Sequence, residues 1–303
     1  MGMKYPQEER AGTVCILGAG ILWGTVGLFV RQLNACGAAP ELMSFLRVLC
    51  AGVIMMVFGL VRSGLNCFRI RKRTLAACAL LGLVCHGIYN VLRSFALLYA
   101  GVGVSTVLQN IAPVVTLLCS SRLFGEQITS KKCIAVILCI LGCALTAANG
   151  SSNAASHLLL GVLFSLGAGA CYGLTAIFSR LVDEGETPVT VSIYSYFFAA
   201  LFLGIWLRPW QGLPTVRGEI MGWSFLYALI PTALAYLLYY RGVQLMHETG
   251  KVPVLASSET VVAVLVGSLA FRESLGMVQI LGISLVLSAI VIMNTKERRR
   301  IPA

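Results

Sequence analysis

The chain has 303 residues, of which 58% are hydrophobic and only 12% are charged, and its formal net charge is +11 at pH 7. A soluble domain carries about 25% charged residues, so this chain lacks the charged surface that a soluble protein needs. The composition therefore excludes the soluble classes and indicates an integral membrane protein.

Ten apolar stretches have about the length of a membrane-crossing helix, which needs roughly 20 residues. We predict these spans at residues 12–30, 41–61, 74–98, 103–124, 132–148, 157–181, 188–207, 219–240, 250–271 and 278–294. The connections are short, which leaves no room for a soluble domain. The N-terminal segment MGMKYPQEER is too short and polar for a signal sequence, so we expect the first span to be retained. The predicted fold class is an all-α integral membrane protein with ten transmembrane helices.

The positive charge follows this topology. With a cytoplasmic N-terminus, only four of the 23 Lys and Arg residues fall in outer loops, at Arg31, Arg208, Arg217 and Arg272. Two more lie within spans, and the rest occupy inner loops and tails. The positive-inside rule then places both termini in the cytoplasm. Because topology explains the charge, we expect the lipid bilayer, and no nucleic acid, as a partner.

Two sequence patterns of the first half recur in the second half. Span one contains GAGILWGTVGLFVR at residues 18–31, and span six contains GAGACYGLTAIFSR at residues 167–180. Span four ends in VVTLLCSSRLFGE at residues 114–126, and span nine ends in VVAVLVGSLAFRE at residues 261–273. The offsets are nearly equal, at 149 and 147 residues, and each is about half of the chain.

We therefore predict two repeats of five spans, residues 1–150 and 151–303, that form one transport unit. Because five is an odd number, the second repeat should insert upside down relative to the first, as in many secondary transporters. The loop after span four is more basic than the loop after span nine, which agrees with this inversion.

Spans two and three carry ionisable side chains. Placing one such side chain at the centre of a membrane helix costs roughly 2.5–3.5 kcal/mol. We therefore expect each of them to have an interaction partner or a function. Arg47 lies in span two, while His86, Asn90 and Arg93 share one face of span three through their i, i+4, i+7 spacing. The two arginines could receive a carboxylate or phosphate, or could pair with helix-end carbonyls and hold the fold. His86 could bind a proton or hydrogen-bond to a neighbouring helix.

Span four contains Gln109 and Pro113. A proline frees the backbone carbonyl four residues earlier and kinks the helix, and broken helices that line cavities use such groups to bind substrate. Gln109 is therefore a candidate binding residue. The loops after spans four and nine begin with Glu126 and Glu273, each expected at the start of the next helix, facing the positive end of its dipole.

The eleven cysteines all precede residue 172, and most lie within spans. The chain has no CxxC motif and no His/Cys spacing typical of a metal site, so cysteine is predicted to be a packing residue. We also find no hydrolase, metalloprotease or phosphate-binding loop motif. The sequence therefore predicts no metal, no cofactor and no catalytic residue.

Aromatic residues could line a cavity between the spans. Trp23, Tyr172 and Tyr236 could stack on a planar or cationic substrate, or could be ordinary packing residues. A second group fits an aromatic belt at the membrane interface better, namely Trp206, Trp210, Tyr239 and Tyr240.

Glu259 lies near the middle of span nine. A carboxylate at this depth could bind a proton and couple transport to the proton gradient, or could bridge two helices. Glu259 is the candidate for proton coupling.

The order of these motifs resembles the EamA-type permeases of the drug/metabolite transporter superfamily. The resemblance covers essentially the whole chain and rests on a Trp-Gly or Tyr-Gly pair in spans one and six, SFLRVLCAG at 44–52, and QNIAPVV…FGE at 109–126. It implies a secondary transporter of small metabolites, usually an exporter, with spans five and ten outside a central cavity. Thr260 stands where this family often has proline, so the helix break expected at Pro113 should lack a counterpart in span nine.

The predicted function is secondary active transport of a small metabolite, such as an amino acid or an organic amine, across the plasma membrane by alternating access. Arg47 with Arg93 favours an anionic or zwitterionic substrate, whereas Glu259 with the aromatic residues favours a cationic amine. Protons are the candidate coupling ions. The alternatives are a passive channel and a membrane-embedded enzyme.

Overall fold

A computed structural model describes residues 4–147, 158–183, 185–211, 216–271 and 276–295. The regular elements in these ranges are all helical. The α-helices are α1 (Lys4–Gly24), α2 (Val26–Ala35), α3 (Pro40–Ser63), α4 (Lys72–Leu80), α5 (Tyr89–Gln109), α6 (Ala112–Phe124), α7 (Ser130–Ala147), α8 (Leu158–Arg180), α9 (Pro188–Leu207), α10 (Gly218–Ala228), α11 (Ala235–Leu245), α12 (Val252–Ala256), α13 (Ser258–Phe271) and α14 (Met277–Asn294). Three short 3₁₀ turns, η1 (Gly64–Phe68), η3 (Pro209–Gln211) and η6 (Thr249–Lys251), and two π-helical segments, η2 (Leu81–Ile88) and η5 (Leu229–Leu234), complete the set.

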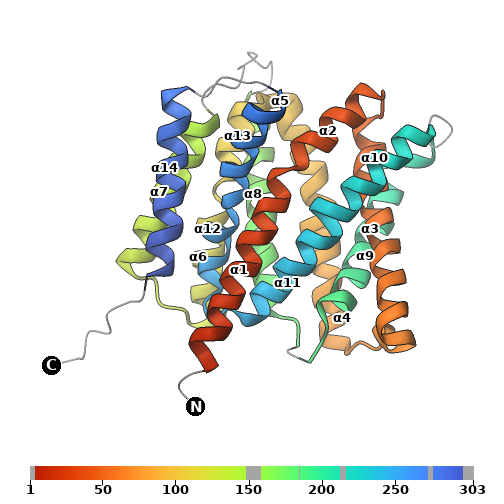
Figure 1. Cartoon of the computed structure of the whole chain (residues 1–303), viewed down its shortest axis with the longest axis horizontal. Helices are drawn as coiled ribbons and strands as arrows, with labels where there is room; N and C mark the ends of the chain where they lie inside the picture. The colour runs from red at the N-terminus through yellow and green to blue at the C-terminus, as the bar shows by residue number, and fades with distance from the viewer. Residues whose placement is uncertain (1–3, 148–157, 184, 212–215, 272–275, 296–303) are drawn as a thin grey trace.

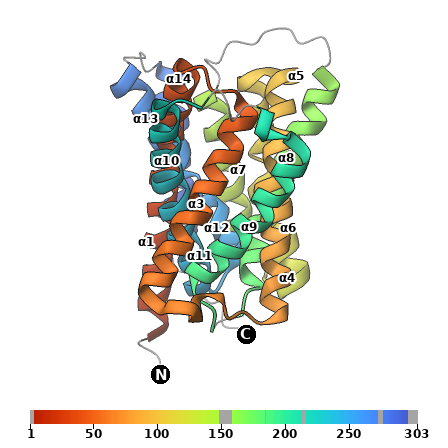
Figure 2. The same ribbon diagram turned by 90° about the vertical axis from the view of Figure 1, so that its right-hand side faces the viewer.

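The helices stand side by side in a bundle whose long axes run in roughly one direction (Figures 1 and 2). Helix α1 begins and helix α14 ends at the same end of this bundle (Figure 1). The hydroxyl of Thr13 in α1 donates to Oδ1 of Asn294 in α14 at 3.2 Å, which joins the two helices at that end. Helices α7 and α14 pack together at one edge of the bundle, where Gly142 and Gly282 let the two backbones approach closely (Figure 1).

Eight helical stretches of the described chain are long and apolar enough to cross a membrane: Gln7–Ala35, Pro40–Phe68, Lys72–Ala100, Leu159–Arg180, Pro188–Leu207, Gly218–Leu245, Thr249–Ala270 and Met277–Asn294. The prediction of a helical, multi-pass membrane protein is confirmed, but only eight of the ten predicted spans meet these criteria. The predicted span 103–124 is interrupted and contains Ala112–Phe124 as a shorter apolar helix. The predicted span 132–148 corresponds to α7, which opens with Ser-Lys-Lys.

Helix α5 includes a reversal of the chain. A straight helix rises 1.5 Å per residue, which would put Gln109 about 30 Å from Tyr89. Instead Nε2 of Gln109 donates to the hydroxyl of Tyr89 at 2.6 Å, and the hydroxyl of Ser105 donates to the carbonyl of Ala96 at 2.8 Å. The chain therefore folds back between Ala96 and Ser105, and the stretch that ends at Gln109 runs antiparallel to the one that begins at Tyr89.

Both predicted spans that contain the second repeated pattern are interrupted. Residues Asn110 and Ile111 separate α5 from α6, just ahead of Pro113, as the proline predicted. The expectation that span nine would lack this feature was wrong, because Ser257 separates α12 from α13. With the 147-residue offset, Ser257 corresponds to Asn110.

Serine side chains take the place of proline at the second interruption. The hydroxyl of Ser257 donates to the carbonyl of Val254 at 2.5 Å, a local bond that competes with helix continuation. The hydroxyl of Ser258 donates to the carbonyl of Leu17 in α1 at 3.4 Å, which ties the interruption to a neighbouring helix.

Glycines of the first repeated pattern allow the closest approaches to these interruptions. A Cβ atom added at Gly169 of α8 would lie 2.6 Å from the carbonyl oxygen of Gln109, and one added at Gly173 would lie 2.6 Å from that of Ala112. Both partners are backbone atoms, which cannot move aside cheaply. Glycine is therefore required at both positions for α8 to pack here.

The equivalent glycines of α1 make the equivalent contacts. A Cβ atom at Gly20 would lie 2.9 Å from the carbonyl oxygen of Ala256, and one at Gly24 would lie 2.9 Å from that of Glu259. The glycine pair of each half of the chain thus packs against the interrupted helix of the other half.

Glu126 binds a helix start, although not the one that was predicted. Its carboxylate accepts from the backbone N–H of Thr249 at 2.6 Å and of Gly250 at 3.0 Å, where η6 leads into α12. We expected it to face α7, the next helix in the chain, whereas it joins the two halves of the molecule. Glu273 lies outside the described residues.

Replacing Glu126 with Ala should destabilise the protein by roughly 2–4 kcal/mol, since each unsatisfied buried donor costs about 1–3 kcal/mol. Thr249 and Gly250 are both buried, so water cannot easily replace the carboxylate. Thermal unfolding in detergent would measure the effect, with the exposed Glu8→Ala as the matched control. Equal melting temperatures for the two variants would contradict this prediction.

A network of ion pairs lies beside Glu126. The ammonium of Lys132 is 2.7 Å from Oε2 of Glu248, and the ammonium of Lys251 is 2.9 Å from Oε1 of Glu9 and 3.6 Å from Oε1 of Glu248. Burial by itself would raise the pKa of Glu248, but the hydrogen bond from Lys132 and the charges of Lys251 and Lys132 outweigh it and hold that pKa below its ordinary value.

The stabilisation from Glu248 should therefore be present above the ordinary glutamate pKa and be lost as the pH falls through the lower pKa of the folded state. We expect Glu248→Gln to be less stable than the wild type at neutral pH, and the gap in melting temperature to close below about pH 4. Thermal unfolding of both proteins across a pH series measures this gap. A gap that stays constant with pH would show that the charge of Glu248 does not stabilise the fold.

Candidate functional site

The predicted site residues come together inside the bundle. Trp23 lies on α1, Arg47 on α3, His86 on η2, Asn90, Arg93 and Gln109 on α5, Tyr172 on α8, Tyr236 on α11 and Glu259 on α13. Trp23, His86 and Tyr236 are buried, whereas the other six are half-buried. Hydrogen bonds and ring contacts between the helices connect these residues into one cluster.

Arg47 is held by neutral groups. Its Nη2 donates to Oδ1 of Asn90 at 3.1 Å, and its guanidinium carbon lies 5.3 Å from the ring centroid of Tyr227 in α10, a cation–π geometry. The Nδ2 of Asn90 donates to the carbonyl of His86, and this bond orients the amide so that its oxygen faces Arg47. No ion pair of the described residues includes Arg47.

His86 is a structural link between two helices. It lies in the π-helical segment η2, and its Nε2 is 3.0 Å from the hydroxyl of Tyr240 in α11. Its ring also contacts the rings of Tyr236 and Tyr196, with centroids 4.5 and 5.4 Å away. Of the two roles expected for His86, the hydrogen bond to a neighbouring helix is the one that this geometry provides.

Arg93 and Gln109 meet at one hydroxyl. Nη1 of Arg93 donates to the hydroxyl of Tyr89 at 3.3 Å, and Nε2 of Gln109 donates to the same oxygen at 2.6 Å. Tyr89 lies three residues after His86, and its ring is 6.0 Å from that of Tyr172, centroid to centroid. Arg93, Gln109 and Tyr89 therefore form one hydrogen-bonded group, which the ring of Tyr89 joins to Tyr172.

Glu259 lies at the start of α13. Its Oε2 accepts from the hydroxyl of Tyr172 at 3.4 Å. Glu259 and Arg93 are close enough to interact electrostatically, yet they are not among the ion pairs of the described residues. The described polar neighbours of Glu259 are therefore the hydroxyl of Tyr172 and the charge of Arg93.

Aromatic rings connect these polar groups. The ring centroid of Trp23 lies 5.0 Å from that of Tyr236, 5.2 Å from that of Tyr239 and 6.2 Å from that of Tyr172. The assignment of Tyr239 and Tyr240 to an interfacial belt was wrong, because both are buried in this cluster. Trp206 and Trp210 are exposed, as expected for a belt.

Several tyrosines of this cluster are not among the predicted site residues, namely Tyr89, Tyr196, Tyr227, Tyr239 and Tyr240. Tyr240 could have been found because the repeat pairs it with Arg93. Tyr89 stands beside Asn90 in span three, and its role depends on the chain reversal within α5. Nothing in the sequence marks Tyr227, whose contact with Arg47 joins α10 to α3.

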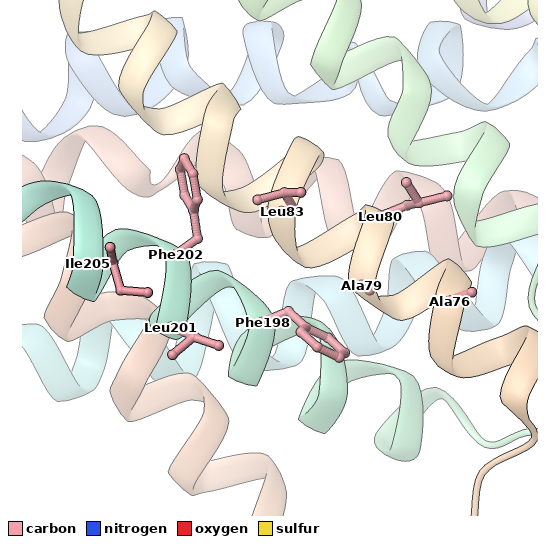
Figure 3. Close-up of a pocket in the computed structure, with 8 residues that line it drawn as sticks. All are labelled: Ala76, Ala79, Leu80, Leu83, Phe198, Leu201, Phe202 and Ile205. Atoms are coloured by element: carbon pink, nitrogen blue, oxygen red, sulfur yellow. The ribbon is translucent and has the colours of Figure 1, made fainter.

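A separate pocket of about 520 Å³ lies between α4, η2 and α9 (Figure 3). Its walls are entirely apolar: Ala76, Ala79, Leu80, Leu83, Phe198, Leu201, Phe202 and Ile205. Such a surface suits contact with lipid chains and offers no group that could recognise a polar solute. The polar and aromatic cluster is therefore the candidate site.

The described residues contain no group of three or more His, Cys, Asp or Glu side chains placed to hold a metal ion. The eleven cysteines are all free.

Known proteins that resemble the chain are transporters. An uncharacterized transporter of Bacillus subtilis (YwfM) is 26% identical over 94% of both chains. An uncharacterized inner membrane transporter of Salmonella typhimurium (YicL) is 25% identical over 97% of this chain and 98% of its own. One crystal structure superposes with a TM-score of 0.79 at 18% identity, covering 94% of this chain and 96% of the other, and supports the fold alone.

The model of the EamA-like transporter family matches twice, at residues 10–148 and at residues 159–295. These two matches cover most of the chain and agree with the family that the motif order indicated. The chain therefore belongs to the EamA-like transporter family and is a multi-pass membrane transporter, not an enzyme.

Proposed function

We propose that this transporter exports a small metabolite that carries a carboxylate across the plasma membrane by alternating access. The observation that carries the proposal is Arg47, a half-buried guanidinium inside the bundle whose described partners are an amide oxygen and an aromatic ring. A charge in this position needs a counterion, and a substrate carboxylate supplies one.

The substrate site in this proposal consists of the residues of the polar and aromatic cluster. Arg47, Arg93 and Gln109 bind the carboxylate end, and Asn90 and His86 hold the binding groups in place. Trp23, Tyr172 and Tyr236 enclose the apolar body of the substrate, and Glu259 binds the coupling proton.

Alternating access in this proposal comes from two inverted halves, residues 1–150 and 151–303, with ten crossings and both termini in the cytoplasm. Three observations support it: the family model matches once in each half, the recurring glycines make equivalent contacts with the interrupted helices, and α1 begins at the end of the bundle where α14 ends. Two halves that meet at a central site are the arrangement that lets one site open to either side in turn.

Counterflow in proteoliposomes tests this function. Purified protein would first be screened by thermal shift against amino acids, organic acids and organic amines, and the best binder would be used radiolabelled. Vesicles loaded with the unlabelled solute should take up the labelled solute transiently above its outside concentration, with saturable kinetics. Uptake that rises linearly with concentration and ignores the internal solute would identify a passive channel and overturn the proposal.

A further inference from the structure

The charges in the cluster do not balance. Its ionisable side chains are Arg47, Arg93, Glu259 and His86, and His86 shares a hydrogen bond with the hydroxyl of Tyr240. The cluster therefore contains two guanidiniums and one carboxylate. An excess of positive charge in a membrane interior is unfavourable, so the cluster favours the binding of an anionic group.

The unmatched charge can be assigned to Arg47. Arg93 interacts electrostatically with Glu259, whereas the described partners of Arg47 are the amide of Asn90 and the ring of Tyr227. A guanidinium has five N–H donors in a planar fork. The bond to Asn90 uses one of them, which leaves donors for a planar, bidentate acceptor such as a carboxylate.

We infer that the substrate is an organic monoanion with a planar apolar body, and that it binds together with a proton on Glu259. This inference rests on the proposed function, because it takes the cluster as the substrate site. Its carboxylate would lie on Arg47. Its planar body would lie against Trp23, Tyr172 and Tyr236, since the ring centroid of Trp23 is 6.2 Å from that of Tyr172 and 5.0 Å from that of Tyr236. Substrate and proton together carry no net charge, so their joint movement is electroneutral, and export in this mode is driven by the outward gradient of the substrate.

The sign of the proton coupling follows from the charges. Ionised Glu259 leaves the empty site with a charge of about +1, and protonation raises it to about +2, which strengthens binding of an anion. Linkage is reciprocal, so a bound anion also strengthens proton binding by the same factor, typically 5- to 150-fold for coupled sites. A cationic substrate would instead compete with the proton.

Groups from several helices determine this linkage. The titratable and charged side chains of the described residues that interact electrostatically with Glu259 are Tyr172 of α8, Arg93 of α5, Tyr236 of α11 and Cys143 of α7. Helix α1 contributes Gly24, which packs against the backbone of Glu259 and carries no charge. Arg93 keeps its charge in proteins, so Glu259 is the group whose proton the substrate can affect.

A charge series with a constant apolar body tests the substrate class. The probes are 3-phenylpropionate, phenylalanine, 3-phenylpropanol and phenethylamine, which are anionic, zwitterionic, neutral and cationic. Isothermal titration calorimetry on the full chain in detergent should show the anion binding about tenfold more tightly than phenylalanine, with the amine weakest. Tightest binding of phenylalanine or of the amine would overturn the inferred class.

A matched pair of variants tests the coupling to the proton. Titration of 3-phenylpropionate in buffers of different ionisation enthalpy should show proton uptake on binding to the wild type and to the exposed Glu8→Gln control, but not to Glu259→Gln. The Glu259→Gln variant should also bind the anion roughly tenfold more tightly than the wild type near neutral pH, because glutamine resembles the protonated acid. Equal affinity and equal proton uptake in the wild type and Glu259→Gln would overturn the coupling.

These experiments separate the two proposals. If the anion binds best but vesicles show no counterflow, the transport mechanism fails while the charge class stands. If phenethylamine binds best and shows counterflow, the charge class fails while transport stands.

Discussion

Replacing Arg47 with Gln should weaken carboxylate binding by roughly 10- to 150-fold and abolish transport at ordinary substrate concentrations. A hydrogen bond to a charged group contributes about 1.5–3 kcal/mol, which corresponds to that range of affinity. The affinity of the Arg47→Lys variant should lie between those of the wild type and Arg47→Gln, because lysine keeps the charge but loses the planar fork. Calorimetric titration of the best-binding carboxylate measures the effect.

A control variant and the melting temperature of Arg47→Gln together separate a binding role of Arg47 from a structural one. The Arg217→Gln variant alters an exposed arginine before α10 and should leave affinity unchanged. Arg47 also contacts Asn90 and Tyr227, so a purely structural role would lower the melting temperature of Arg47→Gln without changing affinity in the fraction that stays folded. That second result would contradict the assignment of Arg47 to the site.

Replacing Gly169 or Gly173 with Ala should destabilise the protein by about 1–3 kcal/mol, the usual cost of overpacking, and should stop transport. The added methyl group would meet the carbonyl oxygen of Gln109 or of Ala112 at 2.6 Å. Since those atoms belong to the helix interruption beside the site, α8 must move away or the interruption must change shape. Thermal unfolding and vesicle counterflow measure the two effects.

The matched control is Gly222→Ala in α10, where an added Cβ meets nothing within 4 Å. Alanine is favoured over glycine in a helix by roughly 0.5–1 kcal/mol, so this variant should be as stable as the wild type or slightly more stable. Alanine at Gly20 or Gly24 of α1 should also lower stability and transport, because an added Cβ would lie 2.9 Å from the carbonyl oxygen of Ala256 or of Glu259. If Gly173→Ala behaved like Gly222→Ala, the close packing of α8 would not be needed for stability or for transport.

Much of the membrane architecture can be predicted from the sequence. Apolar stretches identify spans because transfer of each side chain into lipid depends mainly on its own chemistry, and eight of the ten predicted stretches are long apolar helices. Pro113 predicted an interruption for an equally local reason, since it lacks the backbone donor that a helix needs. Arg47, His86, Arg93 and Glu259 were recognisable because charge and polarity are rare and costly in spans.

Which groups meet was decided by the tertiary structure. The interruption at Ser257 needs no proline, because serine hydroxyls and the closely packed glycines of α1 provide the local bonds and the space for it. The positions of Tyr239 and Tyr240 along the predicted span indicated the membrane interface, but both side chains lie on the side of α11 that faces the interior of the bundle.

The partners of the charged residues depend in the same way on helices that are distant in sequence. Glu126 caps a helix start more than 120 residues later, and Arg47 contacts Asn90 and Tyr227 from two other helices. The sequence by itself determined a helical membrane transporter and the costly residues within its spans, because these follow from each residue's own chemistry and its neighbours along the chain. Only the tertiary structure decided that Arg47 has amide and aromatic neighbours while Arg93 and Glu259 offset each other, because pairing depends on distances between helices that no local pattern records.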